Sequence, residues 1–484
     1  MIKLYKHQRQ ALNKANLKKG FLYLMEQGTG KTITALVEAW ELYDLDLIDC
    51  VVILAPNGVH RQWIESELNE HFGDKNYETF VWRGVRSERE QNKLEKIKNT
   101  DSKLTFFSFN YEAVRLNINR GTKSLSLVKL EEIVNDKRCL LIADESTRIG
   151  NPDAQQTLAA LLLSKKCEYK RGLSGTCING TPLTLYSQLK LIDSTILTYN
   201  YAVFKSIFAV TKDMVSANKK VIRIIVGFKN LLKLAGILEP HSYRVKAEDC
   251  LDLPKLSIVK IKTELSPKQS KLYNELRDKL VSEFENEEIT APHVLTLMIR
   301  LQQISNGFVK VDFSEECQLI DAENNKVAQL LNILKSIDDN RKIIIWSRSV
   351  DFLKHIYNIL ESEFPNQTVR YWGGISKAER EDAKEKFLLK NREDLSKRIF
   401  LGNPAAGGTG LNLQAANYMI YLDRYFDLEI NQQSEKRHHR NGQNLPCFTY
   451  YISNKDTIDE KIEMAIERKE NIKSIILKDK LKYV

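Results

Sequence analysis

The chain has 484 residues, of which 43% are hydrophobic and 28% are charged. This length exceeds what one hydrophobic core usually holds, so two domains are expected, and the composition excludes a globally disordered protein. Lys and Arg number 73 against 63 Asp and Glu, for a formal net charge of +10. That balance favours polyanionic partners such as nucleic acid, although simple solubility explains it as well.

Seven cysteines are scattered singly along the chain, without the close pairs that a zinc site or a disulfide framework would need. The first residues, MIKLYKHQRQ, lack the apolar run of a signal peptide, and no apolar stretch approaches the length of a membrane span. We therefore expect a soluble protein of a reducing cytoplasm, the host cytoplasm if the source is a virus, with no membrane partner.

The first half of the sequence predicts an α/β fold. Short apolar runs bounded by polar or turn residues are typical of buried parallel strands, and they occur at 20–25, 50–56, 103–109 and 138–145. Between them, segments 31–43 and 58–72 carry apolar residues at spacings of three and four, as crossover helices do.

From about residue 185 to 301 the pattern is predominantly helical, and strand-like runs return at 342–347, 368–374, 398–404 and 418–425. We therefore predict an N-terminal lobe over 1–240, with a helical insertion at about 190–240. A linker with a helical protrusion follows over 241–310, and a C-terminal lobe over 311–484. Its lysine-rich last segment, 467–484, predicts a basic helix, either solvated or a binding tail.

The segment MEQGTGKT, residues 25–32, lies between a predicted strand and a predicted helix, which is the context of a phosphate-binding loop. Glycine allows backbone N–H groups to point into one concavity, and the helix N-terminus adds positive charge. A full-length motif would have glycine where this chain has Met25. A structural elbow is the alternative, but the Lys–Thr pair favours nucleotide binding by Gly28, Thr29, Gly30, Lys31 and Thr32.

The segment CLLIADEST delivers Asp144 and Glu145 to the C-terminal end of a predicted strand, where ligands bind in open α/β sheets. Asp144 and Thr32 are expected to hold Mg²⁺, and Glu145 to orient and deprotonate an attacking water. Alone, an acidic pair after a strand is more often a helix cap or solvated turn. Its combination with the glycine turn favours a catalytic role.

Hydrolysis of a phosphoanhydride also needs positive charge on the leaving phosphate. The segment QQSEKRHHRNGQ offers Arg437 and Arg440, three residues apart on a predicted helix face. In isolation such a helix is more often a solvated surface. We predict that both arginines serve the hydrolysis site.

Taken in order, these segments resemble the superfamily-two helicases, and within them the Swi/Snf-like double-stranded DNA translocases. LYKHQRQAL is similar to the segment that reads adenine, which assigns Gln8 to that role. LSGTCINGTPLTLYSQL resembles the family's coupling motif, which places Ser174, Gly175 and Thr176 between ATP hydrolysis and nucleic-acid movement. The family resemblance implies two tandem RecA-like lobes with ATP and Mg²⁺ bound between them.

The segment from NPAAGGTGLNLQAANYMIYLDRY to QQSEKRHHRNGQ resembles the last two family motifs in order and spacing, and adds Gly408 and Gly410 to the nucleotide-binding set. Polar residues in the motif loops are candidate contacts to the nucleic-acid backbone, although each can equally cap its own loop. They are Asn57, Arg61, Asn110, Ser347 and Thr409.

The chain departs from the family at Met25, at Ser146 and Thr147 after the acidic pair, and at Cys177. The resemblance nevertheless implies a DNA-dependent ATPase that moves along double-stranded DNA. We expect a monomeric, compact motor of bacterial or phage type, with protein partners supplying specificity in trans. The alternatives are a helicase that separates strands of DNA or RNA, and a nucleotide-gated DNA clamp with little turnover.

Overall fold

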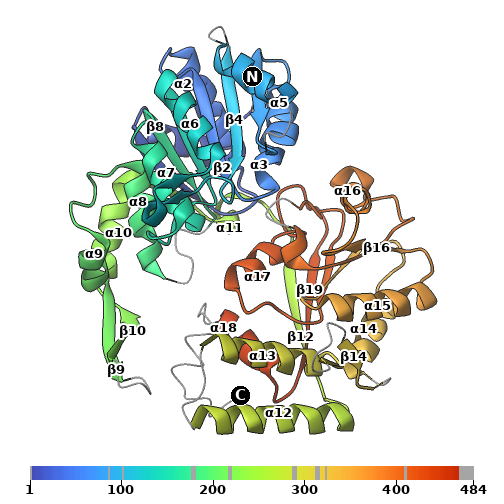
Figure 1. Cartoon of the computed structure of the whole chain (residues 1–484). Coiled ribbons are helices and arrows are strands. Elements are labelled where there is room, and N and C mark those ends of the chain that lie inside the picture. The colour runs from blue at the N-terminus through green and yellow to red at the C-terminus, as the bar shows by residue number, and fades with distance from the viewer. Residues whose placement is uncertain are drawn as a thin grey trace. The chain divides into compact units, whose positions relative to one another are not determined.

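The protein is described from a computed structural model that covers residues 3–84, 88–100, 103–175, 181–215, 221–285, 291–310, 317–321, 324–407 and 411–467. The chain divides into two compact units that meet in the sequence between Leu251 and Asp252. Each unit is built on its own parallel β-sheet (Figure 1). The predicted fold class, two tandem α/β lobes with parallel sheets, is confirmed.

The first unit holds a seven-stranded sheet in the order β11-β1-β8-β7-β2-β4-β3, and every neighbouring pair runs parallel. Strands β1, β2, β4 and β7 form at the four predicted apolar runs, whereas β3, β8 and β11 were not predicted. Their bounds are β1 Gly20–Met25, β2 Cys50–Ala55, β3 Tyr77–Val81, β4 Leu104–Asn110, β7 Cys139–Asp144, β8 Tyr169–Leu173 and β11 Ser242–Val245.

Side chains alternate between the two faces of this sheet, and each face is covered by helices. On β2, Val51 and Ile53 enter one apolar cluster, whereas Val52 and Leu54 enter the other. The first cluster is closed by α1 (Lys6–Ala15), α2 (Lys31–Asp44) and the run α3 (Val59–Gln62), a π-helical turn (Trp63–Leu68) and α4 (Asn69–Phe72). The second is closed by α5 (Glu88–Lys98), α6 (Leu125–Asp136) and α7 (Gln155–Ser164).

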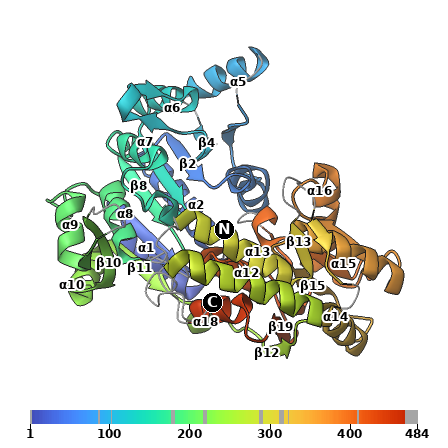
Figure 2. The same ribbon diagram turned by 60° about the horizontal axis from the view of Figure 1, so that its bottom comes forward.

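The predicted helical insertion at about 190–240 is only partly helical. Helices α8 (Leu185–Ile192), α9 (Tyr201–Phe208) and α10 (Leu231–Leu238) are present, but β9 (Ala209–Val215) and β10 (Val221–Phe228) form a separate antiparallel ribbon between α9 and α10. Isoleucine and valine recur along β10, and these β-branched residues fit a strand better than a helix. In Figures 1 and 2 the ribbon lies beside α9 and α10.

The second unit holds a six-stranded parallel sheet in the order β12-β19-β18-β15-β17-β16. On β15, Ile343 and Ile345 face α14 (Asn325–Ser336) and α15 (Val350–Glu363), whereas Ile344 and Trp346 face α16 (Lys377–Lys386). The strands are β12 Leu256–Thr263, β15 Ile343–Trp346, β16 Thr368–Tyr371, β17 Ile399–Gly402, β18 Tyr418–Tyr421 and β19 Cys447–Asn454.

The segment predicted as a linker, 241–310, contains one strand of each sheet. Its first residues form β11, which pairs with β1 in the first sheet, and β12 pairs with β19 in the second. Both segments are therefore edge strands of their own lobes, because each completes a backbone ladder there. Helices α12 (Pro267–Glu285) and α13 (Ala291–Ser305) follow, and α13 shares an apolar cluster with α18 (Ile458–Glu467).

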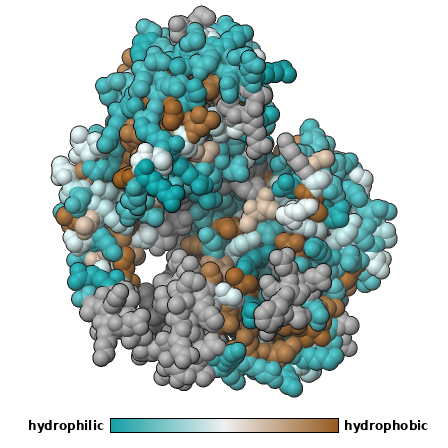
Figure 3. Space-filling model, viewed as in Figure 1, coloured by the Kyte–Doolittle hydropathy of each residue, from teal (hydrophilic) through white to brown (hydrophobic). Residues whose placement is uncertain are grey.

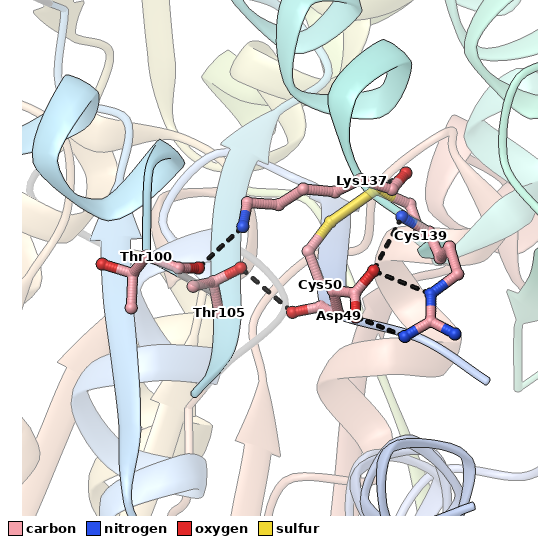
Figure 4. The surroundings of a disulfide bond; sticks show 7 residues. Asp49, Cys50, Thr100, Thr105, Lys137 and Cys139 are labelled. Carbon is pink, nitrogen blue, oxygen red and sulfur yellow. Dashed lines mark hydrogen bonds and ion pairs between the residues drawn. A yellow bond between two sulfur atoms is a disulfide. The ribbon is translucent and has the colours of Figure 1, made fainter. Parts of the chain in front are cut away.

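A disulfide joins Cys50 on β2 to Cys139 on β7, although the scattered cysteines predicted none (Figure 4). The two residues lie directly opposite each other in the parallel ladder, with their Cα atoms 4.9 Å apart. Both are buried. Close spacing along the sequence was the wrong criterion, because the sheet brings together positions 89 residues apart.

Within the described ranges, no helix is both long enough and apolar enough to cross a membrane. In Figure 3 the surface around the upper lobe is mostly hydrophilic, with apolar side chains in small groups.

Candidate active site

The glycine turn between β1 and α2 has the strand–turn–helix context that the sequence predicts. Gly28 and Gly30 adopt φ angles of 83° and 82°, in the left-handed region that favours glycine. Thr29 holds the turn closed, because its N–H and its hydroxyl both donate to the carbonyl of Glu26, at 3.2 and 2.7 Å. Met25 is the last residue of β1 and is fully buried, so the turn begins after the core strand ends.

Helix α1 contacts this turn through the side chains of His7 and Gln8. The imidazole Nε2 of His7 lies 2.8 Å from the carbonyl oxygen of Thr29, and Gln8 Nε2 donates to the same oxygen at 3.2 Å. A Cβ atom on Gly30 would lie 2.2 Å from Gln8 Nε2, so the Gln8 side chain would have to move, and the φ angle of 82° itself favours glycine. Gln8 Oε1 accepts from the backbone N–H of Tyr5. Its assignment to adenine remains a prediction.

Three neighbouring strands deliver the candidate residues to one edge of the sheet. Strand β8 lies between β1 and β7, so the turn after β1, Ser174 after β8 and Asp144 on β7 share the carboxyl-terminal edge. Ser174 is fully buried and donates its N–H to the carbonyl of Tyr23 at 3.1 Å. An ideal Cβ on Gly175 would lie 3.8 Å from Lys31 Nζ, which brings Lys31 next to this segment.

Asp144 is the most strongly perturbed carboxylate of this edge. Burial and the neighbouring Glu145 raise its pKa to about 6, against the opposing effects of Trp63 and Lys31. The indole Nε1 of Trp63 donates to Asp144 Oδ2 at 2.8 Å, and the N–H of Glu145 donates to Oδ1 at 2.9 Å. A carboxylate this buried keeps its charge only with such partners, and perturbed carboxylates of this kind are typical of catalytic sites.

Glu145 occupies a left-handed backbone conformation, with φ 47° and ψ 56°. For a residue other than glycine this costs of order 1 kcal/mol, so the surrounding contacts must hold it. On one side the Tyr111 hydroxyl donates to the Asp144 carbonyl at 2.8 Å. On the other, the Ser146 hydroxyl donates to Gln188 Oε1 on α8 at 2.8 Å. Ser146, one of the departures from the family pattern, thus ties the acidic pair to α8.

The oxygen ligands of this edge suit Mg²⁺. The Asp144 carboxylate and the Thr32 hydroxyl are hard donors, and Mg²⁺ is commonly held by one or two protein ligands with water and phosphate completing its shell. In the described part of the chain no group of three or more His, Cys, Asp or Glu could form an all-protein cage. The assignment of Asp144 and Thr32 to a nucleotide-bound Mg²⁺ stays a prediction.

Arg437 and Arg440 do not lie on a helix as predicted. Helix α17 (Leu428–Glu435) ends before them, and both follow in the turns after it. His438, which follows Arg437, is fully buried, and burial lowers its pKa to about 3. Arg437 is also buried, and its Nη1 donates to the carbonyl of Leu411 at 3.1 Å, whereas Arg440 is half-buried.

The candidate backbone contacts have different surroundings. Asn57 is exposed, Arg61 is half-buried, and Asn110 is half-buried with its amide 3.3 Å from Glu112. Ser347 is fully buried and donates its hydroxyl to Asp423 at 2.7 Å. The prediction for Ser347 is therefore corrected, because a hydroxyl enclosed by protein and already bonded has no surface to offer a phosphate.

Asp423 belongs to a buried polar network in the second unit. It also accepts from Asn306 Nδ2 and from the backbone N–H of Arg348, both at 2.6 Å. The amide oxygen of Asn306 accepts from Lys326 Nζ at 2.9 Å, and the same ammonium pairs with Asp459 at 2.6 Å. Lys326 is fully buried, so this ammonium is compensated entirely by protein groups.

Several predicted residues lie outside the described part of the chain. They are Thr176, Cys177, Gly408, Thr409, Gly410 and the basic segment 468–484. Conversely, Trp63, Tyr111 and Gln188 contact the acidic pair or its loop but were not predicted as site residues. Trp63 lies in a segment that resembles a family motif and that supplied Arg61 as a predicted backbone contact, but that resemblance gave Trp63 no role of its own.

Comparison with known families matches nearly the whole chain. The SNF2-related domain matches residues 7–308, and the helicase conserved C-terminal domain matches residues 325–442.

Individual relatives are more distant. The chain is 26% identical, over 73% of its length, to the protein named "Putative ATP-dependent helicase/translocase YwqA" of Bacillus subtilis, of which the match covers 37%. It is 25% identical, over 68% of its length, to chromatin remodeling factor mit1 of Schizosaccharomyces pombe, of which the match covers 23%. Among solved structures, the Sulfolobus solfataricus SWI2/SNF2 ATPase core in complex with dsDNA is similar over 99% of this chain and 94% of that chain, with 22% identity and a TM-score of 0.41. The matches span well under half the length of these curated relatives.

Proposed function

Because the chain belongs to the SNF2-related domain family, we propose that it hydrolyses ATP to move along double-stranded DNA. The observation that carries the proposal is the meeting, at one sheet edge, of the glycine turn, Lys31 and the perturbed carboxylate of Asp144. A phosphate-binding turn alone would support only nucleotide binding. The same turn beside a buried acidic pair supports hydrolysis.

The first unit supplies most of the proposed chemistry. The N–H groups of the turn and the N-terminus of α2 bind phosphate oxygens, and Lys31 neutralises the β- and γ-phosphates. Glu145, held in its strained conformation by the contacts of Tyr111 and Ser146, orients and deprotonates the attacking water. Asp144 and Thr32 are the proposed Mg²⁺ ligands, and the bound ion supplies charge neutralisation as the β–γ bond breaks.

Arg437 and Arg440 are proposed as arginine fingers, a role that accelerates hydrolysis by about 10³-fold or more. Ser174 and Gly175, which touch β1 and approach Lys31, are assigned to coupling between hydrolysis and DNA. DNA contact by Asn57, Arg61 and Asn110 would depend on charge and shape and not on base sequence.

The proposed function is tested by ATP turnover of the whole chain with and without duplex DNA. We expect stimulation by duplex, loss of nearly all turnover in Lys31→Ala, and wild-type turnover in the matched control Lys165→Ala, which changes an exposed lysine of the same unit. Turnover that ignores DNA would contradict a DNA motor. DNA binding that responds to ATP without turnover would indicate the clamp instead.

Displacement of a third strand from intact duplex separates translocation from strand separation. A translocase displaces the third strand and leaves a forked duplex paired. Unwinding of the fork without displacement of the third strand would favour the strand-separating helicase.

A further inference from the structure

The ribbon formed by β9 and β10, here called the arm, packs on little besides itself. Its two strands pair with each other and with no other described strand. Thr211, Lys212, Asp213, Arg223 and Ile225 are all exposed. A two-stranded ribbon of this kind is marginal by itself, and its exposed backbone edges invite a partner.

Positive charge is concentrated at the base of the arm, and the arm itself carries Lys212 and Arg223. Over the described residues 205–215 and 221–233 the basic side chains are Lys205, Lys212, Arg223, Lys229 and Lys233, and the acidic one is Asp213. Asp213 forms an ion pair with Arg223, whose Nε lies 2.8 Å from Asp213 Oδ1. Among described residues, no acid lies within ion-pair distance of the other four. Lys212, Lys229 and Lys233 are exposed as well.

The dimensions of the arm fit a DNA groove. Its strands have seven and eight residues, and at about 3.3 Å per residue the ribbon is roughly 25 Å long. The major groove of B-DNA admits a two-stranded β-ribbon, and this length corresponds to about seven base pairs at roughly 3.4 Å each. Lys212 on the ribbon and the lysines at its base would then lie within reach of phosphates.

We propose that the arm is a DNA-binding element of this chain, which lies along a duplex groove and pairs its lysines with backbone phosphates. The inference rests on the proposed function for its partner, but not on any residue of the hydrolysis site. Binding through phosphates is insensitive to base sequence, as a motor that moves along DNA requires. The arm thus gives the first unit a second point of contact with duplex DNA.

Apolar side chains on the arm raise the alternative of a protein partner. Val210, Ile225 and Phe228 are 40%, 36% and 36% exposed, and apolar side chains are visible on that side of the molecule in Figure 3. These exposures are moderate, and Lys212 and Arg223 lie on the same two strands. A protein-binding patch is more typically a contiguous apolar surface with few charges at its centre. The charge distribution therefore favours a polyanion.

The test is duplex binding by the whole chain, measured as a function of salt. Replacing Lys212, Lys229 and Lys233 together with glutamine should weaken binding equally for unrelated DNA sequences. It should also reduce the slope of log affinity against log salt by about three, one for each lost phosphate contact. The matched control makes the same charge change at exposed lysines of the same unit, Lys93, Lys96 and Lys165, and should leave the slope near that of the wild type.

A second variant removes the arm without disturbing its base. Ala209 and Phe228 are register partners, so residues 210–227 can be replaced by a two-residue Asn-Gly turn that joins them directly. We expect weakened duplex binding with unchanged ATP turnover in the absence of DNA.

The two proposals fail separately in this design. Wild-type affinity and salt slope in both arm variants would overturn the DNA-binding arm, whether or not DNA stimulates turnover. An arm-dependent salt slope without stimulation of ATP turnover would support the arm and contradict the motor. Absence of any duplex binding by the wild-type chain would overturn both.

Discussion

Trp63→Phe is expected to weaken the hydrolysis site without removing any residue assigned to catalysis. Trp63 donates its indole N–H to Asp144 across 2.8 Å, and phenylalanine keeps most of the packing while removing the donor. Because this hydrogen bond favours the ionised carboxylate, its loss raises the pKa of Asp144. A larger share of the protein would then hold Asp144 protonated and unable to bind Mg²⁺.

The size of the effect follows from the strength of the bond. A hydrogen bond to a charged group contributes about 1.5–3 kcal/mol, which corresponds to roughly one to two pKa units. Starting from a pKa of about 6, Asp144 would then titrate at roughly 7 to 8 in the variant. At pH 7 the ionised fraction falls from about nine-tenths to roughly one-half or one-tenth, and ATP turnover should fall in proportion.

The assay is ATP turnover against pH, at saturating and limiting Mg²⁺. Trp63→Phe should shift the acidic limb of the pH profile to higher pH by about one unit or more. At high pH the turnover of the variant should approach that of the wild type. Trp40→Phe is the matched control, since Trp40 lies in the same apolar cluster and its buried indole N–H has no partner among the described residues. An unshifted limb, or a loss that high pH does not restore, would refute the assigned role of Trp63.

Three other predictions concern the arginines, the buried lysine and the acidic pair. Arg440→Ala should reduce turnover by about 10³-fold or more, and a loss of only a few-fold would make it structural. Lys326→Met should lower the free energy of unfolding in urea by about 3–5 kcal/mol, because it leaves buried carboxylates without their cation; a change under 1 kcal/mol would contradict that. Asp144, whose pKa is raised on folding, binds more protons folded than unfolded between about pH 4 and 6. Its contribution to stability is therefore lost as pH rises through that window, by about 3 kcal/mol in total. Asp144→Asn should flatten this part of the pH dependence of unfolding, and an unchanged slope would refute the raised pKa.

The disulfide supplies a further prediction. In the chain-entropy account, a bond that closes a loop of 89 residues stabilises the folded state by up to about 4–5 kcal/mol. Reduction should therefore lower the thermal midpoint of the wild type but not of the Cys50→Ala/Cys139→Ala double variant. Equal response of both proteins to reductant would contradict it.

Local pattern was sufficient for much of the fold. Eight buried strands and the turn with Gly28 and Gly30 formed where apolar runs and glycine spacing predicted them, whereas β3, β8, β11, β12 and β19 were not predicted. Contacts between distant parts of the chain determined the elements that local pattern did not predict. Helical spacing predicted Arg437 and Arg440 on one helix, but α17 ends at Glu435, before both arginines.

Contacts between distant residues carry no local signal. Trp63 and Asp144 are 81 residues apart, and neither the spacing nor the chemistry of the segment around Trp63 marks a partner. The same holds for the strands that bring Cys50 and Cys139 together. The arm differs, because the repeated isoleucine and valine of β10 are a strand signal that the surrounding helical segments obscured.

The central claim is that the glycine turn and the acidic pair form one site that binds and then hydrolyses ATP. The most direct test measures ATP binding and single-turnover hydrolysis in the same samples of wild-type protein and Glu145→Gln, with Glu70→Gln as the control at an exposed glutamate. The site as assigned predicts that Glu145→Gln binds ATP but hardly hydrolyses it, while the control behaves as the wild type. Substantial hydrolysis by purified Glu145→Gln would contradict it.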